Sequence, residues 1–160
     1  MQSIFSGDIQ LKKGNLVSTI TSISPEYEVT FSVKPTAFTR GYSNVLHFTT
    51  GGDHGKFGYR IPGVWFNWNK LHICESAKHS YNYCANSQGL AKNKWTDVKI
   101  VNKKIDSIYW YTVYVNGKQI ARTDNPGART YKNVKVYVTD PWHTPFKGFL
   151  RNLKIKVTGE

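Results

Sequence analysis

Apolar and polar residues alternate one by one along much of this chain, and this period-two pattern is the feature that most restricts its fold. In the segment 27–34 (YEVTFSVK), the aromatic and valine side chains share one face of an extended strand and the polar side chains share the other. The run 133–138 repeats the pattern with three valines, and 151–157 repeats it with Arg151 on the same face as Leu153. No window of eleven residues has the i, i+3, i+4, i+7 apolar spacing of an amphipathic helix. The chain is therefore expected to be built from strands.

Several shorter segments complete this picture. The further strand candidates are 44–50, 61–68, 70–76, 95–101, 107–115 and 118–122. Asn116-Gly117 supplies the two positive φ angles of a type I′ hairpin turn. Short strands with turn residues every 8–12 positions predict an all-β antiparallel sandwich or barrel, with a core between two facing sheets. The length of 160 residues suits one domain, and neither a linker nor a repeat is visible, so we expect residues 1–160 to form a single unit.

The charge is strongly positive. Twenty-two Lys and Arg against ten Asp and Glu give a net charge of +12, which favours anionic partners. The lysines at 99, 135, 154 and 156 point outward by alternation. They form either a basic stripe that attracts sulfated or carboxylated polymers, or a soluble face that protects sheet edges. No stretch approaches the ~20 apolar residues of a membrane span. Residues 1–20 lack the apolar run of a secretory signal, which is expected for an intracellular chain, a processed chain or a domain cut from a longer protein.

Cys74 and Cys84 flank a nine-residue segment centred on His79. If this segment is a hairpin, the two cysteines lie opposite each other and a disulfide can form. Closing a loop of ~10 residues would add roughly 2–3 kcal/mol in the chain-entropy account, and the bridge would imply an oxidising compartment. The alternative is two unrelated free thiols. The spacing does not suit paired zinc ligands.

Four motifs, in order, resemble laminin-G-like domains. Segment 93–100 (NKWTDVKI) is similar to the family strand that opens with tryptophan, and 114–118 (YVNGK) to its next hairpin. Segment 146–155 (FKGFLRNLKI) resembles the closing strand, and 45–53 (VLHFTTGGD) an early strand with its acidic loop. The resemblance implies a concanavalin A-like jelly roll and an extracellular or secreted module that binds glycans or proteins. Phe149 stands where the family often has cysteine.

The resemblance also implies a cation site. Many laminin-G-like domains hold calcium at the rim of the sandwich, with one acid from the loop that matches Asp53 and another ligand from a later loop, where Asp140 is the candidate. Calcium takes six to eight oxygen ligands, so two carboxylates in a basic protein are few. Alternatively, Asp53 forms an Asx-turn and Asp140 precedes a turn proline.

The loop 51–60 holds the densest cluster of glycines, which lets a backbone approach a ligand closely or simply makes a long, mobile hairpin connection. Polar side chains in and near such loops could meet sugar hydroxyls or acidic groups. The expected ligand-binding residues are Asp53, His54, Arg60, Arg129, Asp140, Trp142 and His143.

The tryptophans divide between core and surface. Trp142 lies in a proline-flanked loop, where an exposed ring could stack on a sugar or could instead close one end of the sandwich. Trp65 and Trp68 are expected on opposite faces of a strand, with Trp68 exposed. Trp95 is expected in the core.

The sequence gives little support for catalysis. Glu26 and Glu28 share a strand face and lie ~7 Å apart along the strand, a separation that paired glycosidase carboxylates can have. However, the sequence has no acidic signature of jelly-roll glucanases, no nucleophile elbow and no metalloprotease motif. We therefore expect a non-enzymatic module that binds glycans, including anionic polysaccharides, with calcium as a candidate cofactor. The alternative is a structural or adhesive matrix protein that acts by protein–protein contacts. Nucleic-acid binding is disfavoured because RNP motifs and recognition helices are missing.

Overall fold

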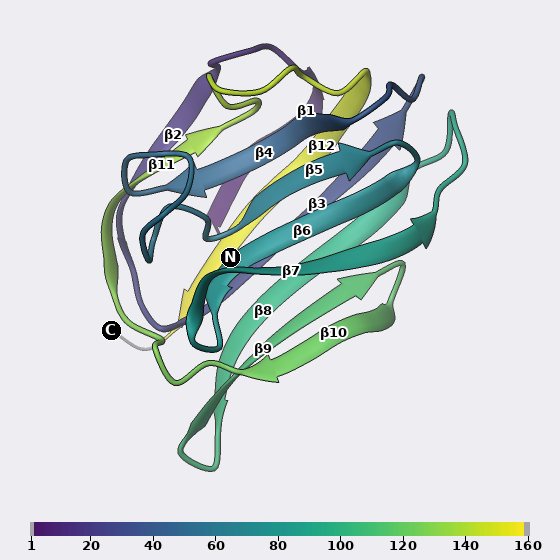
Figure 1. The fold of residues 1–160 in the computed structure, drawn as a ribbon. Helices are drawn as coiled ribbons and strands as arrows, with labels where there is room; N and C mark the ends of the chain where they lie inside the picture. The colour runs from purple at the N-terminus through teal and green to yellow at the C-terminus, as the bar shows by residue number, and fades with distance from the viewer. Residues whose placement is uncertain (1, 159–160) are drawn as a thin grey trace.

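The computed structural model describes residues 2–158 as two antiparallel six-stranded sheets packed face to face (Figure 1). Sheet I has the order β1-β12-β3-β8-β9-β10, and its strands are β1 (Gln2–Gln10), β12 (Gly148–Thr158), β3 (Glu26–Pro35), β8 (Thr96–Ile105), β9 (Ile108–Val115) and β10 (Lys118–Asp124). Sheet II has the order β2-β11-β4-β5-β6-β7, and its strands are β2 (Leu16–Ile23), β11 (Tyr131–Tyr137), β4 (Tyr42–Thr49), β5 (Gly63–Asn67), β6 (Lys70–Ala77) and β7 (Ser80–Gly89). These residues contain no α-helix, and no helix among them could cross a membrane.

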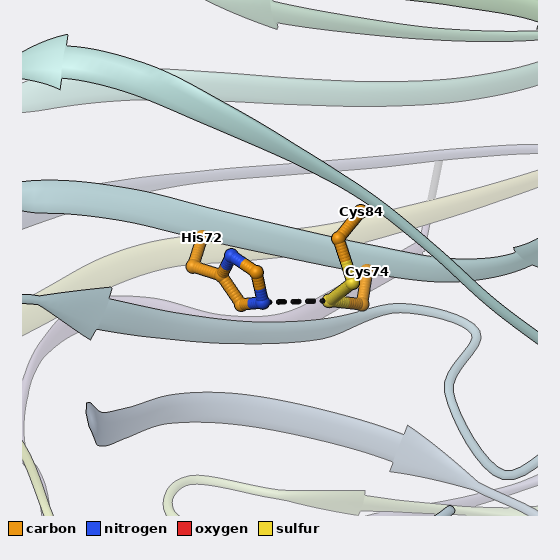
Figure 2. Close-up of side chains that lie close together, drawn as sticks. All are labelled: His72, Cys74 and Cys84. Atoms are coloured by element: carbon orange, nitrogen blue, oxygen red, sulfur yellow. Dashed lines mark hydrogen bonds between the residues drawn. A yellow bond between two sulfur atoms is a disulfide. The ribbon is translucent and has the colours of Figure 1, made fainter. Parts of the chain in front are cut away.

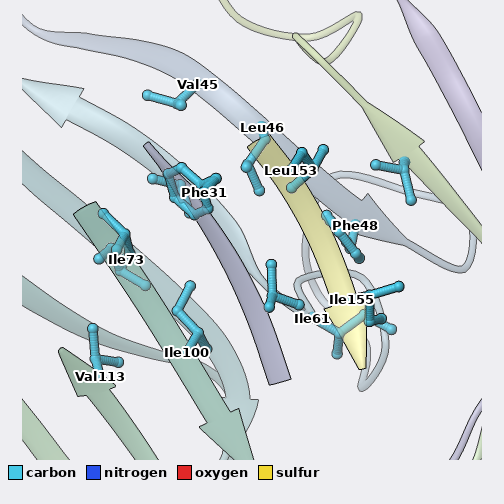
Figure 3. Close-up of a cluster of buried hydrophobic side chains, with 14 of the residues drawn as sticks. Phe31, Val45, Leu46, Phe48, Ile61, Ile73, Ile100, Val113, Leu153 and Ile155 are labelled. Atoms are coloured by element: carbon cyan, nitrogen blue, oxygen red, sulfur yellow. The ribbon is translucent and has the colours of Figure 1, made fainter. Parts of the chain in front are cut away.

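The alternation seen in the sequence builds the core, which lies between the two sheets (Figure 3). The inward side chains of β3, from Tyr27 to Val33, are at most 4% exposed, and the three alternating valines of 134–138 are fully buried. Phe31 of sheet I and Phe48 of sheet II are both members of this cluster. Each fully buried side chain of this size contributes roughly 1.5–3 kcal/mol. The predicted sandwich is therefore held together by the faces that the period-two pattern indicated.

The hairpin at Asn116-Gly117 is as predicted. Both residues have positive φ angles, 49° and 77°, and β9 pairs with β10 on either side, Val115 opposite Lys118. The two positive angles match the twist of the strands that the turn joins.

The prediction for β12 was wrong at its beginning. Asn152 has a positive φ of 56°, and the pairing with β3 shifts between Arg151 and Lys154. This irregularity adds a residue to one strand, so Arg151 pairs with the outward Ser32 and does not share the inward face of Leu153. The guanidinium of Arg151 lies 3.9 Å from the ring centroid of Trp95.

Trp95 is also placed differently from the prediction. It precedes β8, whose inward side chains are Thr96, Val98 and Ile100, so it has the parity of the outer face. The ring is half-buried under the Arg151 guanidinium and is not part of the core.

β6 places one acidic side chain, Glu75, on the inward face of its sheet. Glu75 is fully buried and accepts a hydrogen bond from the Tyr27 hydroxyl at one carboxylate oxygen, while its other oxygen has no partner among the described residues. Burial raises the pKa of Glu75 well above its ordinary value. The core therefore favours the protonated, neutral form of this side chain.

Candidate functional site

The outer face of sheet II, turned away from the core, carries a group of aromatic and basic side chains. Trp65 of β5 lies opposite Asn44 on β4 and opposite His72 on β6, and His47 of β4 lies opposite Gly63. Adding a Cβ to Gly63 would bring it within 2.5 Å of the Trp65 ring. The glycine therefore leaves the space that the indole occupies.

Trp65 is buried although it does not face the core, with only 3% of its surface exposed. The guanidinium of Arg60 covers the ring at 4.4 Å from its centroid, a stacked cation–π geometry. The rings of His47 and His143 approach edge-on, each at 5.4 Å between centroids. Trp68 is 54% exposed, as predicted. The expectation that the other tryptophan faces the core was wrong, because Trp65 is buried on the outer face of the sheet and Trp68 lies beyond the end of β5.

Asp140 organises the neighbouring loop with four hydrogen bonds. Its Oδ1 accepts the backbone amides of Trp142 at 3.0 Å and His143 at 2.8 Å. Its Oδ2 lies 2.8 Å from Nδ1 of His47 and 2.8 Å from Nδ1 of His143. Burial by itself would raise the pKa of Asp140, but the hydrogen bonds and charges of the two histidines hold it well below its ordinary value. The group is thus a buried carboxylate saturated with donors.

His47 joins this carboxylate to the Gly-rich loop. It is fully buried, with Nδ1 facing Asp140 and Nε2 2.6 Å from the carbonyl oxygen of Tyr59. Its two ring nitrogens therefore link the Asp140 carboxylate to the backbone of the Gly-rich loop.

Asp53 ties the same two loops together at the surface. Arg60 contacts the Asp53 carboxylate at 3.1 Å and donates its Nε to the Asp53 carbonyl at 3.0 Å. Nε2 of His143 lies 3.7 Å from the other Asp53 carboxylate oxygen. The hydrogen bond to Asp140 raises the pKa of His143 above its ordinary value, against the opposing effect of burial. Asp53, Arg60, Asp140 and His143, four of the predicted residues, therefore form one network.

A shallow cavity of about 190 Å³ opens beside this network, which we call the outer cavity. It is lined by Tyr42, Arg60, Trp65, His72 and His143.

A disulfide supports the far wall of the outer cavity. Cys74 and Cys84 are paired across β6 and β7 and form the bridge shown in Figure 2. Nε2 of His72 lies 3.2 Å from the Cys74 sulfur, and Nδ1 lies 2.8 Å from the Asn86 side-chain oxygen. These two contacts fix the ring of His72. The bridged sulfurs are not thiolates, so this group is not a metal centre.

Trp142 lies next to the network but does not line the outer cavity. The residue is 40% exposed, and its ring has edge contacts with His47 at 5.4 Å and Tyr137 at 6.0 Å between centroids. The remaining ring surface is open to solvent, so the residue does not seal the end of the sandwich.

Two predicted residues lie apart from this network. His54 is exposed in the Gly-rich loop. Arg129 is also exposed; its guanidinium covers Phe57 at 4.6 Å and its Nε donates to the Gly127 carbonyl. Within residues 2–158, no hydrogen bond or ion pair joins either side chain to Asp53 or Asp140.

Sequence reasoning missed Tyr42, His47 and His72. All three lie on strands, and we assigned binding only to loops. Alternation along β6 does place His72 on the outer face, which was an available signal. On β4 the pairing shifts between Asn44 and Leu46, so the outward position of His47 was hidden.

The two predicted calcium ligands do come together, and donor atoms of His47, Asp53 and Asp140 lie within 4.8 Å of one another. Both oxygens of Asp140 already accept two hydrogen bonds each, and those of Asp53 face Arg60 and His143. Calcium needs six to eight oxygens without competing cations, so this arrangement does not fit it. Calcium binding stays a prediction against which these contacts argue.

Comparison with solved structures identifies similar folds at low sequence identity. The heptameric SAP-like pentraxin from Limulus polyphemus has a TM-score of 0.60 at 13% identity, over 98% of this chain and 79% of that one. The receptor-binding domain of botulinum neurotoxin D has a TM-score of 0.63 at 13% identity, over 96% of this chain and 41% of that one. The receptor-binding domain of botulinum neurotoxin type G has a TM-score of 0.59 at 13% identity, over 95% of this chain and 40% of that one. This chain therefore spans about two fifths of the toxin domains. No protein-family model and no curated sequence matches. The predicted jelly-roll sandwich fold is confirmed.

Proposed function

We propose that this protein is a non-enzymatic, lectin-like module that binds a glycan at the outer cavity. The observation that carries the proposal is a small solvent-open hollow in which Tyr42 and His72 supply ring surfaces while Arg60 and His143 supply polar atoms. Trp65 also lines the hollow, where it is buried beneath Arg60. Carbohydrate sites combine an aromatic ring for the apolar face of a sugar with a few fixed polar groups for its hydroxyls.

The polar groups are held in place before a ligand arrives. Arg60 is fixed by Asp53, Asn82 and the Trp65 ring, and His143 by Asp140. Ligand binding therefore does not have to order these side chains. Ordering a mobile side chain costs roughly 0.5–1.5 kcal/mol of binding free energy. This preorganisation distinguishes the outer cavity from a chance surface hollow.

Charges around the outer cavity are nearly balanced. Arg60 is paired with Asp53, and His47 and His143 are both paired with Asp140. A balanced site recognises hydroxyl groups better than it recognises a strongly charged sugar. The geometry accordingly supports a neutral or weakly acidic glycan here, with Trp142 as an additional stacking surface beside the network.

A glycan array and titration calorimetry test this proposal. We expect wild type to bind at least one neutral glycan, and His72→Ala and Trp142→Ala each to weaken binding by roughly 5-fold or more, since stacking on one ring is worth about 1 kcal/mol or more. Trp68→Ala is the matched control, because Trp68 is exposed and its ring contacts Phe38, whereas the Trp142 ring contacts His47 of the network. Absence of binding to every glycan, or equal weakening in the control, would overturn the proposal.

The remaining expectations belong to the same proposal: one laminin-G-like unit over residues 1–160, in an extracellular or secreted setting. The Cys74–Cys84 bridge supports an oxidising compartment. Repeating the array with a chelator tests the calcium prediction, and the saturated carboxylates lead us to expect unchanged binding. Capture of a protein partner that glycans do not displace would instead favour the structural or adhesive alternative.

A further inference from the structure

A hollow larger than the outer cavity lies on the opposite side, on the outer face of sheet I. It has a volume of about 520 Å³ and is lined by residues of β3, β8, β9 and β12, among them Thr30, Ser32, Lys99, Tyr114 and Lys154. A second hollow of about 280 Å³ adjoins it at Tyr114. Together they form a trough across the sheet, large enough for several sugar units.

The strand register places two lysines on opposite walls of this trough. Lys154 pairs with Thr30, Thr30 pairs with Lys99, and Lys99 pairs with Tyr114, so the four residues form a row across the sheet. Strands two apart are separated by roughly 10 Å, so the two ammonium groups can reach one anionic group above the Thr30 hydroxyl. This distance is also about one Debye length, over which their fields add.

The positive charge continues along the face. The neighbouring row contains Lys156 and Arg122, and Lys103 lines the second hollow. Three acidic side chains lie among them. The Asp97 carboxylate accepts the Ser32 hydroxyl at 2.5 Å, Glu28 forms an ion pair with Lys99 at 3.9 Å, and Glu26 accepts the Lys104 amide. The five basic side chains outnumber these three carboxylates, so the trough has an excess of positive charge.

Aromatic rings on this face hold the cations in place. Lys99 lies 5.5 Å from the centroid of Tyr114, and the guanidinium of Arg122 lies 4.3 Å from that of Trp110. A ring face covered by a cation is not free to stack on a nucleobase, which is how single-stranded nucleic acids are usually held. The arrangement instead suits a polymer whose recognisable groups are discrete anions.

We propose that the outer face of sheet I is a second binding site, which takes an anionic polysaccharide, with Lys99 and Lys154 gripping its charged groups. This site does not depend on the outer cavity, because it lies on the other sheet and uses charge in place of hydroxyl recognition.

Heparin affinity measured over a range of salt concentrations tests the proposal. We expect Lys99→Gln/Lys154→Gln to lower the slope of log affinity against log salt by about 2, one for each lysine that no longer neutralises an anionic group of the polymer. Lys132→Gln/Lys135→Gln on sheet II removes the same charge from exposed positions and should leave the slope unchanged. Circular dichroism and the melting temperature establish that both variants are folded.

Three outcomes would overturn the proposal: an equal decrease in affinity in both double variants, no decrease in either, or displacement of heparin by oligo-dT at lower concentration than by heparin itself. Polygalacturonate as a second probe separates recognition of carboxylates from recognition of sulfates, and binding of either supports the site. Trp142→Ala should keep heparin binding while weakening binding of the neutral glycan, so the two proposals can fail separately.

Discussion

Replacing Asp140 by asparagine tests whether the buried network at the outer cavity is as tightly coupled as its geometry indicates. The substitution keeps the shape and one oxygen, which can still accept the amides of Trp142 and His143. It puts an NH₂ group where Oδ2 now faces the imidazoles of His47 and His143, at 2.8 Å each. The negative charge is lost, and two contacts with a charged carboxylate oxygen become contacts with a neutral NH₂ group.

The expected cost is large. A hydrogen bond to a charged group contributes roughly 1.5–3 kcal/mol, and removing one partner of a buried ion pair costs roughly 3–5 kcal/mol. We therefore expect D140N to lower the free energy of unfolding by roughly 3–5 kcal/mol. This loss corresponds to a fall in melting temperature of roughly 6–20 °C for a domain of this size.

The pH dependence gives the experiment a second readout. The pKa of Asp140 is held well below its ordinary value, so its stabilisation is complete above the unfolded pKa of about 3.9 and is lost as the pH falls through the folded pKa. The pKa of His143 is raised, so its stabilisation is complete below about 6.5 and is lost as the pH rises through the folded pKa. The network therefore stabilises the fold most between about pH 4 and 6.5, and D140N should flatten the profile on both sides.

Urea unfolding from pH 3 to pH 9 measures both effects. Asp106→Asn is the matched control, because Asp106 is exposed in a turn with a positive φ of 49° that asparagine also adopts; its effect should stay within about 0.5 kcal/mol. A decrease below about 1 kcal/mol for D140N, or a pH profile identical to wild type, would refute the reasoning.

Three further changes test other parts of the structure. Glu75→Gln should stabilise the protein increasingly as the pH rises above about 4.5, because the raised pKa of the buried carboxyl means that wild type loses stability there. Urea unfolding should show a larger difference in unfolding free energy between variant and wild type at pH 8 than at pH 5. Gly63→Ala should cost roughly 1–3 kcal/mol and red-shift tryptophan fluorescence, since the new methyl group would displace the Trp65 ring; an unchanged spectrum would contradict this. Cys84→Ser should lower the free energy of unfolding by roughly 2–3 kcal/mol, and reduction of wild type should give the same midpoint as this variant.

Most strands and their inward faces could be predicted because each inward position follows from local alternation, but β1 and β2 were not among the expected strands. The segment 27–34 and the valines of 133–138 needed no knowledge of any partner strand. Predictions failed where the backbone departs from that alternation: the irregularity at Asn152 turned Arg151 outward, and the parity of Trp95 was assigned to the wrong face.

The candidate site was predicted only in its loops. Asp53, Arg60, Asp140 and His143 were expected near the rim, and they do form one network. His54 and Arg129 were chosen on the same grounds and lie apart from it, because proximity along a loop does not decide which way a side chain turns. The strand residues that complete the outer cavity were absent from the prediction.

The amino-acid sequence by itself determined that this chain forms strands, where its tight hairpin lies, which side chains of the regular strands enter the core and that its surface is basic, since each of these depends on residues near one another along the chain. Only the tertiary structure decided which outward faces became sites. The outer cavity depends on β4, β5 and β6 lying in register beside a loop from residue 140 onward, and the basic trough depends on β12 and β8 flanking β3. Strand order and register are set by packing between distant segments, and period-two alternation contains no information about them.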